Sequence, residues 1–146
     1  MKKLSFCLLL FTFPVSLFAQ TQQDDVTNAV KDYVDAFYYG DTSKIHRSIN
    51  VNVVKYGYYM PKGKTIYEGE PMPFKEMIDY AAGVKKRGVS PDVEKFPKKI
   101  EVFDVQDQTA SAKLTAWWGT DYILLARLNN RWMITHVLWQ SPPPKN

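Results

Sequence analysis

Five polar side chains that lie far apart in the sequence could meet in one apolar pocket and move a proton there. They are Tyr33, His46, Tyr56, Asp121 and His136. Burial in an apolar site raises the pKa of a carboxyl, so Asp121 could release and recover a proton, with His136 as a second catalytic candidate. A tyrosine hydroxyl would stabilise a developing oxyanion. This set of groups is typical of a cofactor-free isomerase or cyclase.

Each of these residues also has an ordinary structural explanation. Tyrosines on apolar faces are commonly core residues with a satisfied hydroxyl, and a histidine within an apolar run, such as His136, is commonly hydrogen-bonded in the core. Asp121 closely follows Gly119 and could simply close a turn. We therefore favour a non-catalytic domain that binds a small molecule or assembles with other chains, and we keep the enzyme as the alternative. A third hypothesis is an interaction module whose interior is filled by its own side chains.

Aromatic residues could complete a pocket for a small apolar or aromatic ligand. Tryptophan and phenylalanine supply large flat surfaces for core packing, for an interface or for stacking on a ligand. The predicted ligand-binding residues are Tyr33, Phe37, His46, Tyr56, Trp117, Asp121, Trp132 and His136.

Several classes of site are missing from the sequence. There is no glycine-rich phosphate loop, no nucleophile elbow and no internal repeat. Two histidines far apart are weak evidence for a metal site, so we expect neither a metal nor a cofactor. The basic clusters at residues 85–87 and 98–99 come with no nucleic-acid-binding motif, and we expect them to be solvated surface.

The first residues have the features of a secretory signal peptide. Lys2 and Lys3 precede an apolar run at residues 4–13, which is too short to span a bilayer. We expect cleavage after Ala19, which would remove Cys7, the only cysteine, and leave no membrane segment. The expected product is a periplasmic or secreted protein with one domain at residues 20–141 and a proline-rich tail at residues 142–146.

Three segments have helical periodicity. Residues 24–39 place Val26, Val30, Tyr33 and Phe37 on one face, and Gly40 follows as a stop signal. Residues 41–49 predict a short second helix, and residues 73–88 predict a third.

The rest of the chain predicts strands at residues 51–60, 65–68, 100–105, 109–118, 121–128 and 131–140. Asn129-Asn130 predicts a tight hairpin of the primed type, because asparagine tolerates positive φ. This turn would pair Arg127 with Trp132, Leu125 with Ile134, Ile123 with His136 and Asp121 with Leu138. On the strand at residues 51–60, Tyr56 is expected to face the interior.

The predicted register makes both faces of the last hairpin apolar. One face would carry Asp121, Ile123, Leu125, Trp132, Ile134, His136 and Leu138, and the other Tyr122, Leu124, Ala126, Met133, Val137 and Trp139. The helices can cover only one face of the sheet. We therefore expect a homodimer through the outer face.

The order of these segments, and several short sequences within them, resemble the nuclear transport factor 2-like superfamily. The resemblance to its putative lumazine-binding branch lies in residues 38–41 (YYGD), His46, and residues 100–105 (IEVFDV), 110–113 (ASAK), 121–122 (DY) and 131–139 (RWMITHVLW). It implies an α+β roll, in which a curved, cone-shaped, mixed or antiparallel sheet wraps round the N-terminal helices. Related branches are polyketide cyclase-like and ketosteroid isomerase-like. The branch label implies a lumazine ligand, but no residue pattern here is specific for a pteridine, so the fold alone does not select a function.

Overall fold

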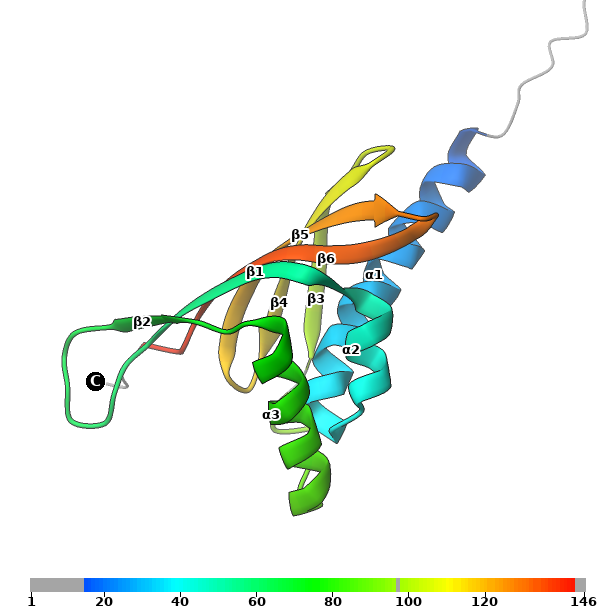
Figure 1. The fold of residues 1–146 in the computed structure, drawn as a ribbon. Coiled ribbons are helices and arrows are strands. Elements are labelled where there is room, and N and C mark those ends of the chain that lie inside the picture. The colour runs from blue at the N-terminus through cyan, green and yellow to red at the C-terminus, as the bar shows by residue number, and fades with distance from the viewer. Residues whose placement is uncertain (1–14, 97, 144–146) are drawn as a thin grey trace, which may run out of the picture.

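The computed structural model describes residues 15–96 and 98–143, and the side chains from residue 21 onward. Three helices lie on one side of a curved sheet (Figure 1). In chain order the elements are α1 (Val15–Tyr39), α2 (Thr42–Ser48), β1 (Ile49–Tyr59), β2 (Glu68–Pro71), α3 (Phe74–Arg87), β3 (Lys99–Val105), β4 (Thr109–Ala116), β5 (Gly119–Leu128) and β6 (Arg131–Gln140). Residues 1–14 of the predicted signal peptide and residues 144–146 of the predicted tail lie outside the described part, and both assignments stay predictions.

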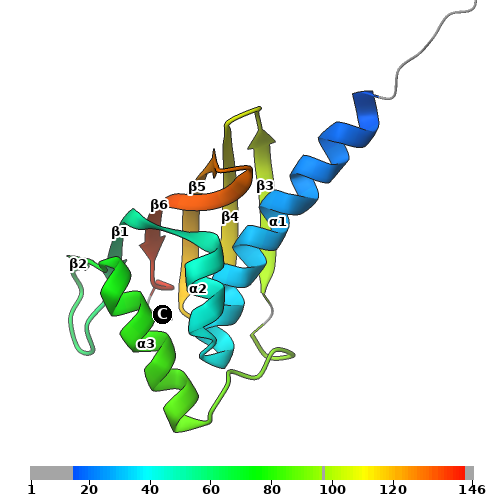
Figure 2. The same ribbon diagram turned by 45° about the vertical axis from the view of Figure 1, so that its right-hand side comes forward.

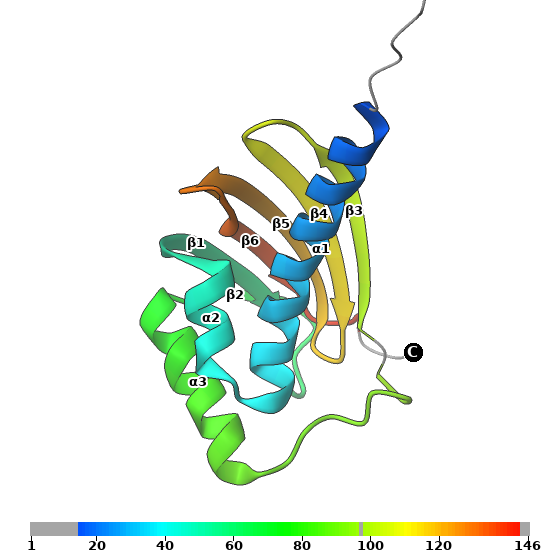
Figure 3. The same cartoon turned by 90° about the vertical axis from the view of Figure 1, so that its right-hand side faces the viewer.

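The six strands form one mixed sheet in the order β2-β1-β6-β5-β4-β3. β1 and β6 run parallel, and the other neighbours are antiparallel. α1 crosses the concave face, with α2 and α3 beside it (Figures 2 and 3). This arrangement confirms the α+β cone expected from the sequence.

The three predicted helices are present, but α1 begins at Val15 rather than at residue 24 and continues through the predicted cleavage point after Ala19. Val26, Val30, Tyr33 and Phe37 of α1 are all buried in the core. Asp41 caps α2 by accepting a hydrogen bond from the backbone N–H of Ser43. Gly88 ends α3 in the left-handed conformation, at φ 65°.

The hairpin between β5 and β6 has the predicted turn but not the whole predicted register. Asn129 and Asn130 both have positive φ, at 50° and 59°, and Arg127 pairs with Trp132 as expected. The register then shifts between Leu124 and Leu125. Thr135 is the extra residue, because Leu124 pairs with His136 while Leu125 pairs with Ile134.

This bulge reverses the faces of the second half of β6. Ile123 pairs with Val137 and Asp121 with Trp139, rather than with His136 and Leu138. A one-residue shift turns every following side chain to the other face. Val137 and Trp139 therefore face the helices, and the prediction that His136 and Leu138 face the interior is wrong: both are exposed on the outer side.

Tyr56 of β1, another predicted site residue, also faces the side opposite to the one predicted. Val53, Lys55 and Gly57 are buried, whereas Val54 and Tyr56 are exposed. Alternation along the strand was predicted correctly, but we expected Tyr56 to face the interior. It faces outward instead, because Val53 packs in the core.

Candidate functional site

A cavity of about 420 Å³ lies between the concave face of the sheet and the helices. Its walls are mostly aromatic and apolar. It is lined by Phe37, Lys55, Met72, Tyr80, Trp117, Trp118, Trp139, Ser141 and Pro142. We call this space the inner cavity; Lys55 is the only ionisable amine or carboxyl group in its lining. Its size and composition are those of a small-molecule pocket.

A chain of hydrogen bonds leads from the inner cavity into the core. Lys55 Nζ donates to the hydroxyl of Tyr33 at 2.9 Å, and that hydroxyl donates to Asp121 Oδ1 at 3.3 Å. Trp118 Nε1 donates to the other oxygen of Asp121 at 2.7 Å. Asp121 and Tyr33 have 0% of their surface exposed, and Lys55 has 8%. We call these four residues the polar network.

The sheet and its glycines position this network. Lys55 points inward because it shares the buried side of β1 with Val53 and Gly57. Gly57 has no side chain, and the Trp139 indole occupies that space: a Cβ built on Gly57 would lie 1.6 Å from Trp139 Nε1. Asp121 lies opposite Trp139, two residues after the turn made by Gly119 at φ 130°.

Burial dominates the electrostatics of the network. Desolvation raises the pKa of Asp121, although the nearby charge of Lys55 and the hydrogen bonds from Trp118 and Tyr33 oppose the shift. Desolvation lowers the pKa of Lys55, and the charge of Asp121 opposes it. Desolvation and the neighbouring Asp121 raise the pKa of the Tyr33 phenol well above its usual range. Tyr33 therefore remains protonated and acts as a link between the two charged groups.

These pKa shifts mean that folding disfavours the charged forms of both residues. The folded protein holds the proton of Asp121 more tightly than the unfolded chain, so stability falls as pH rises through the window from the ordinary aspartate pKa to the raised one. Lys55 loses its proton more readily in the folded protein than in the unfolded chain. Stability therefore falls as pH falls from the ordinary lysine pKa to the lowered one. The network is thus not explained by its contribution to the stability of the fold.

A second buried aspartate, Asp35, has a pKa shifted in the opposite direction from that of Asp121. Asp35 accepts hydrogen bonds from Lys98 at 2.6 Å and from Lys44 at 2.9 Å. Although burial raises its pKa, the two lysines outweigh this and hold the pKa of Asp35 below its usual range. Asp35 therefore adds stability above the ordinary aspartate pKa and loses it in acid. Lys98, which we expected on solvated surface, instead ties its loop to α1.

Lys55 has no such partner. Within residues 15–96 and 98–143, no carboxylate forms an ion pair with Lys55, and Tyr33 is its one hydrogen-bond acceptor. A lysine ammonium has three N–H donors. Its nitrogen lies 4.9 Å from the Phe37 ring centre and 5.3 Å from that of Tyr33, contacts that favour the cation modestly. Donor capacity therefore remains at the wall of the inner cavity.

The structure brings together some of the predicted site residues. Phe37 and Trp117 line the inner cavity, and Tyr33 and Asp121 lie behind it, joined by a hydrogen bond. Trp132 is buried in the core and lines a separate polar hollow with Asp32 and Arg47.

Three other predicted site residues lie away from the inner cavity. His46 is exposed on α2, with its ring against Phe74 of α3 at 5.6 Å. Tyr56 and His136 line a hollow on the outer face of the sheet. The bulge at Thr135 explains the position of His136, and the alternation of β1 explains that of Tyr56.

Lys55 is the functional candidate that the sequence analysis missed. Strand alternation already placed it on one side with Val53 and Gly57. A lysine on the side of a strand that is otherwise apolar was the signal, because lysine is almost never fully buried unless it is paired. Trp118 and Trp139 were recognised as large aromatic residues but were not assigned to the site.

The described residues contain neither a metal-binding cluster nor a membrane-spanning helix. No group of three or more histidine, cysteine, aspartate or glutamate side chains in this part of the chain could hold a metal ion. None of the described helices combines the length and apolar character needed to cross a bilayer.

Comparison with known proteins identifies the fold. A family model described as "Putative lumazine-binding" matches residues 21–140. No curated protein is similar enough to count as a match.

Solved structures match over most of the chain. A nuclear transport factor 2-like protein of unknown function from Shewanella baltica OS155 superposes with a TM-score of 0.61 at 13% identity, covering 91% of this chain and 99% of that one. A second such protein, from Silicibacter pomeroyi DSS-3, gives 0.59 at 15% identity, covering 82% and 95%. The association domain of C. elegans CaMKII gives 0.51 at 13% identity, covering 82% and 95%. At these identities the structures show that the fold is that of nuclear transport factor 2-like proteins, whereas the sequence match shows the family: the chain belongs to the family described as "Putative lumazine-binding".

Proposed function

We propose that this chain is a small-molecule-binding domain whose ligand is flat, largely apolar and carries one oxygen acceptor. The observation that carries the proposal is Lys55, a buried lysine in the wall of an aromatic cavity that has no ion-pair partner among the described residues. The aromatic rings provide apolar stacking surface, and the free N–H groups of Lys55 would hydrogen-bond a carbonyl, carboxylate or similar group. An unmatched polar group in an apolar pocket gives orientation and specificity to a bound ligand.

The position of Asp121 favours binding over acid-base catalysis. Tyr33 and Trp118 occupy one oxygen each, and Asp121 has no exposed surface and does not line the inner cavity. A general base must come within hydrogen-bond distance of the proton that it removes. In this geometry Asp121 instead holds Tyr33, which in turn holds Lys55.

An acid-base enzyme is the second candidate, and one observation favours it. A carboxylate with a raised pKa is hydrogen-bonded to a tyrosine close to an apolar cavity, as expected for an isomerase or cyclase. This function requires Asp121 to reach the substrate. It predicts that a molecule retained by the purified protein leaves in a different chemical form, whereas binding predicts release of the same molecule.

Anilinonaphthalene sulfonate is a suitable probe of the binding proposal, because it combines aromatic rings with a sulfonate group that accepts hydrogen bonds. We expect it to fluoresce in the inner cavity and to lose affinity by about 10-fold to 100-fold in Lys55→Met, because a hydrogen bond to a charged group contributes about 1.5–3 kcal/mol. Lys75→Met is the matched control, since the Lys75 side chain is 84% exposed on α3. Equal affinities of the two variants, measured by fluorescence titration, would contradict the proposal.

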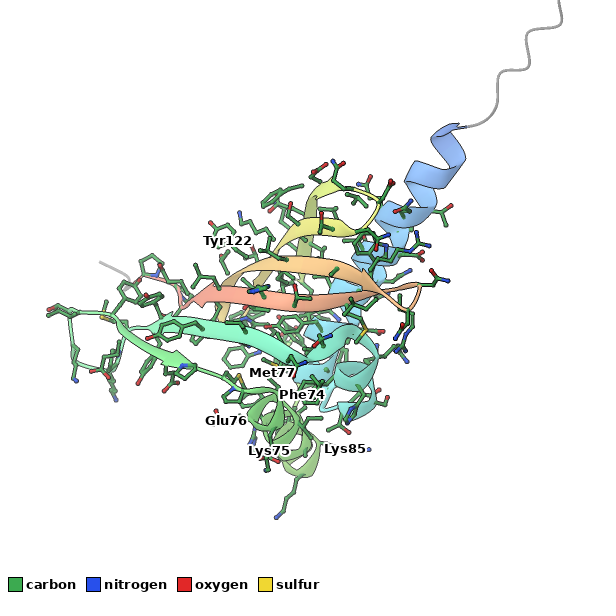
Figure 4. The ribbon with its side chains drawn as sticks, turned by 45° about the horizontal axis from the view of Figure 1, so that its top comes forward. Phe74, Lys75, Glu76, Met77, Lys85 and Tyr122 are labelled. Carbon is green, nitrogen blue, oxygen red and sulfur yellow. The ribbon has the colours of Figure 1, made fainter. Side chains whose placement is uncertain are left out.

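We also propose that two copies of the chain associate through the outer face of the sheet. A hollow of about 410 Å³ there is lined by Val54, Tyr56, Phe103, Ser111, Ala112, Tyr122, Ile123, Leu124, His136, Val137 and Leu138. Figure 4 shows Tyr122 on the side of the sheet away from Phe74 and Met77 of α3. No aspartate, glutamate, lysine or arginine lines this outer hollow. A second copy fits because it would present the same largely apolar patch across a two-fold axis.

Leu124→Glu tests this association. Leu124 is 51% exposed in the outer hollow, and a two-fold interface would bring two of the new carboxylates together. We expect the dimer dissociation constant to rise by about 100-fold or more, since like charges in an interface cost several kcal/mol. Val89→Glu, at an exposed position after α3, should leave the dimer intact. Sedimentation of the unmodified chain as a monomer would refute the association.

A further inference from the structure

The chemistry of Lys55 narrows the class of ligand. Its nitrogen is in the wall of the inner cavity, 2.9 Å from the Tyr33 hydroxyl, and no carboxylate in the described part of the chain pairs with it. Lysines become nucleophiles when an apolar pocket desolvates them. Described lysines elsewhere are held differently: Lys44 and Lys98 pair with Asp35, and Lys75 pairs with Asp79 on exposed helix surface.

We propose that Lys55 binds aldehydes or ketones covalently, as a reversible imine formed inside the aromatic cavity. This inference rests on the proposed binding function and names its ligand class. The acceptor oxygen that Lys55 recognises would be a carbonyl oxygen, and the aromatic walls would hold the apolar part of the molecule. Depression of the lysine pKa by desolvation agrees with this role, because only the neutral amine attacks a carbonyl.

The polar network provides a path for the protons that the reaction moves. In the first step Lys55 Nζ gives a proton to the Tyr33 oxygen while the Tyr33 phenol proton passes to Asp121. The amine lone pair then attacks the carbonyl carbon, and the carbonyl π electrons move to oxygen. Transfer of one proton from nitrogen to that oxygen gives a neutral carbinolamine.

The second half of the reaction returns the proton. Asp121 gives its proton back through Tyr33 to the carbinolamine nitrogen, which is the Lys55 nitrogen beside the Tyr33 hydroxyl. One proton then passes from that nitrogen to the carbinolamine oxygen, and the nitrogen lone pair expels the oxygen as water. The products are a protonated imine on Lys55, one water molecule and the original Asp121 carboxylate, so atoms and charge balance. Water entering the cavity reverses the reaction and releases the ligand unchanged.

Reductive trapping tests the proposal on the unmodified protein. The protein is incubated at neutral pH with naphthaldehyde and sodium cyanoborohydride, which reduces an imine to a stable amine, and the adducts are mapped by peptide mass spectrometry. We expect Lys55 to be labelled at least about tenfold faster than Lys75, because the aromatic walls hold the aldehyde beside its amine, whereas Lys75 lies on exposed helix surface. Labelling of Lys55 should also quench the fluorescence of the tryptophans that line the cavity.

Two variants test whether Lys55 is the reactive lysine and whether Tyr33 carries its proton. Lys55→Met should abolish the fast labelling and leave only the slow labelling of exposed lysines. Tyr33→Phe keeps the ring but breaks the hydrogen-bonded path to Asp121. The labelling rate of Lys55 should therefore fall, and it should increase more steeply with pH. A merely structural role for Tyr33 would change the rate without changing this pH profile. Circular dichroism confirms that each variant is folded.

The outcomes separate this inference from the binding function on which it rests. If naphthaldehyde quenches tryptophan fluorescence but Lys55 is labelled no faster than Lys75, the imine is refuted and the binding function stands. If naphthaldehyde neither quenches nor labels, and anilinonaphthalene sulfonate also fails to bind, both are refuted.

Discussion

Asp121→Asn is expected to lower the free energy of unfolding by about 2–4 kcal/mol, because it leaves Lys55 as a buried cation without a nearby negative charge. The asparagine amide also presents hydrogen-bond donors to Trp118 or Tyr33, which are themselves donors here. Chemical denaturation followed by circular dichroism measures the change at neutral pH. The effect should be large even though Asp121 contacts no other charged group directly.

Adding Lys55→Met to Asp121→Asn should restore at least half of the lost stability, because the double variant buries no charge in the polar network. Asp79→Asn is the control: Asp79 is exposed on α3, so its effect should stay within about 0.5 kcal/mol. Additive effects of the two network substitutions would show that Lys55 and Asp121 are not coupled, and would contradict the electrostatic account of the site.

Gly57→Ala is expected to change the shape of the inner cavity by displacing Trp139, one of its lining residues. The added Cβ would overlap the Trp139 indole, at 1.6 Å from Nε1, so Trp139 must leave its place beside Lys55. Overpacking of this kind costs about 1–3 kcal/mol, and the binding surface that Trp139 contributes is lost. We expect both a lower unfolding free energy and a clear loss of affinity for anilinonaphthalene sulfonate.

Gly83→Ala provides a matched control for this substitution. A Cβ on Gly83 meets only the end of the Arg87 side chain, at 3.2 Å, in the interior of α3. Alanine is favoured over glycine in a helix by about 0.5–1 kcal/mol, so this variant should be slightly more stable and bind the probe normally. Unchanged stability and affinity in Gly57→Ala would mean that Trp139 does not form the wall described here.

Much of the fold was predictable because it follows from local patterns. The stripe of Val26, Val30, Tyr33 and Phe37 predicted the buried face of α1, and Asn129-Asn130 predicted the primed turn between β5 and β6. These features depend on residue type and spacing alone.

The site was only partly predictable, because it depends on two features that spacing does not show. The bulge at Thr135 displaces one residue from the ladder, so Val137 and Trp139 take the inner positions predicted for His136 and Leu138. A bulge depends on how the whole sheet curves around the helices, which is not a local property of β6. The sequence shows Lys55 on an otherwise apolar side of β1, but its position in a cavity wall and the absence of an ion-pair partner among the described residues are visible only in the structure.

The central claim is that the inner cavity, with Lys55 in its wall, is where a ligand binds. Nuclear Overhauser contacts between bound anilinonaphthalene sulfonate and the protein test it most directly, because the outer hollow has nearly the same volume and a similar apolar lining. The account predicts contacts from the aromatic protons of the probe to the Lys55 side chain and the Trp139 indole. Contacts to Tyr122 and Leu124, with none to Lys55, would contradict it.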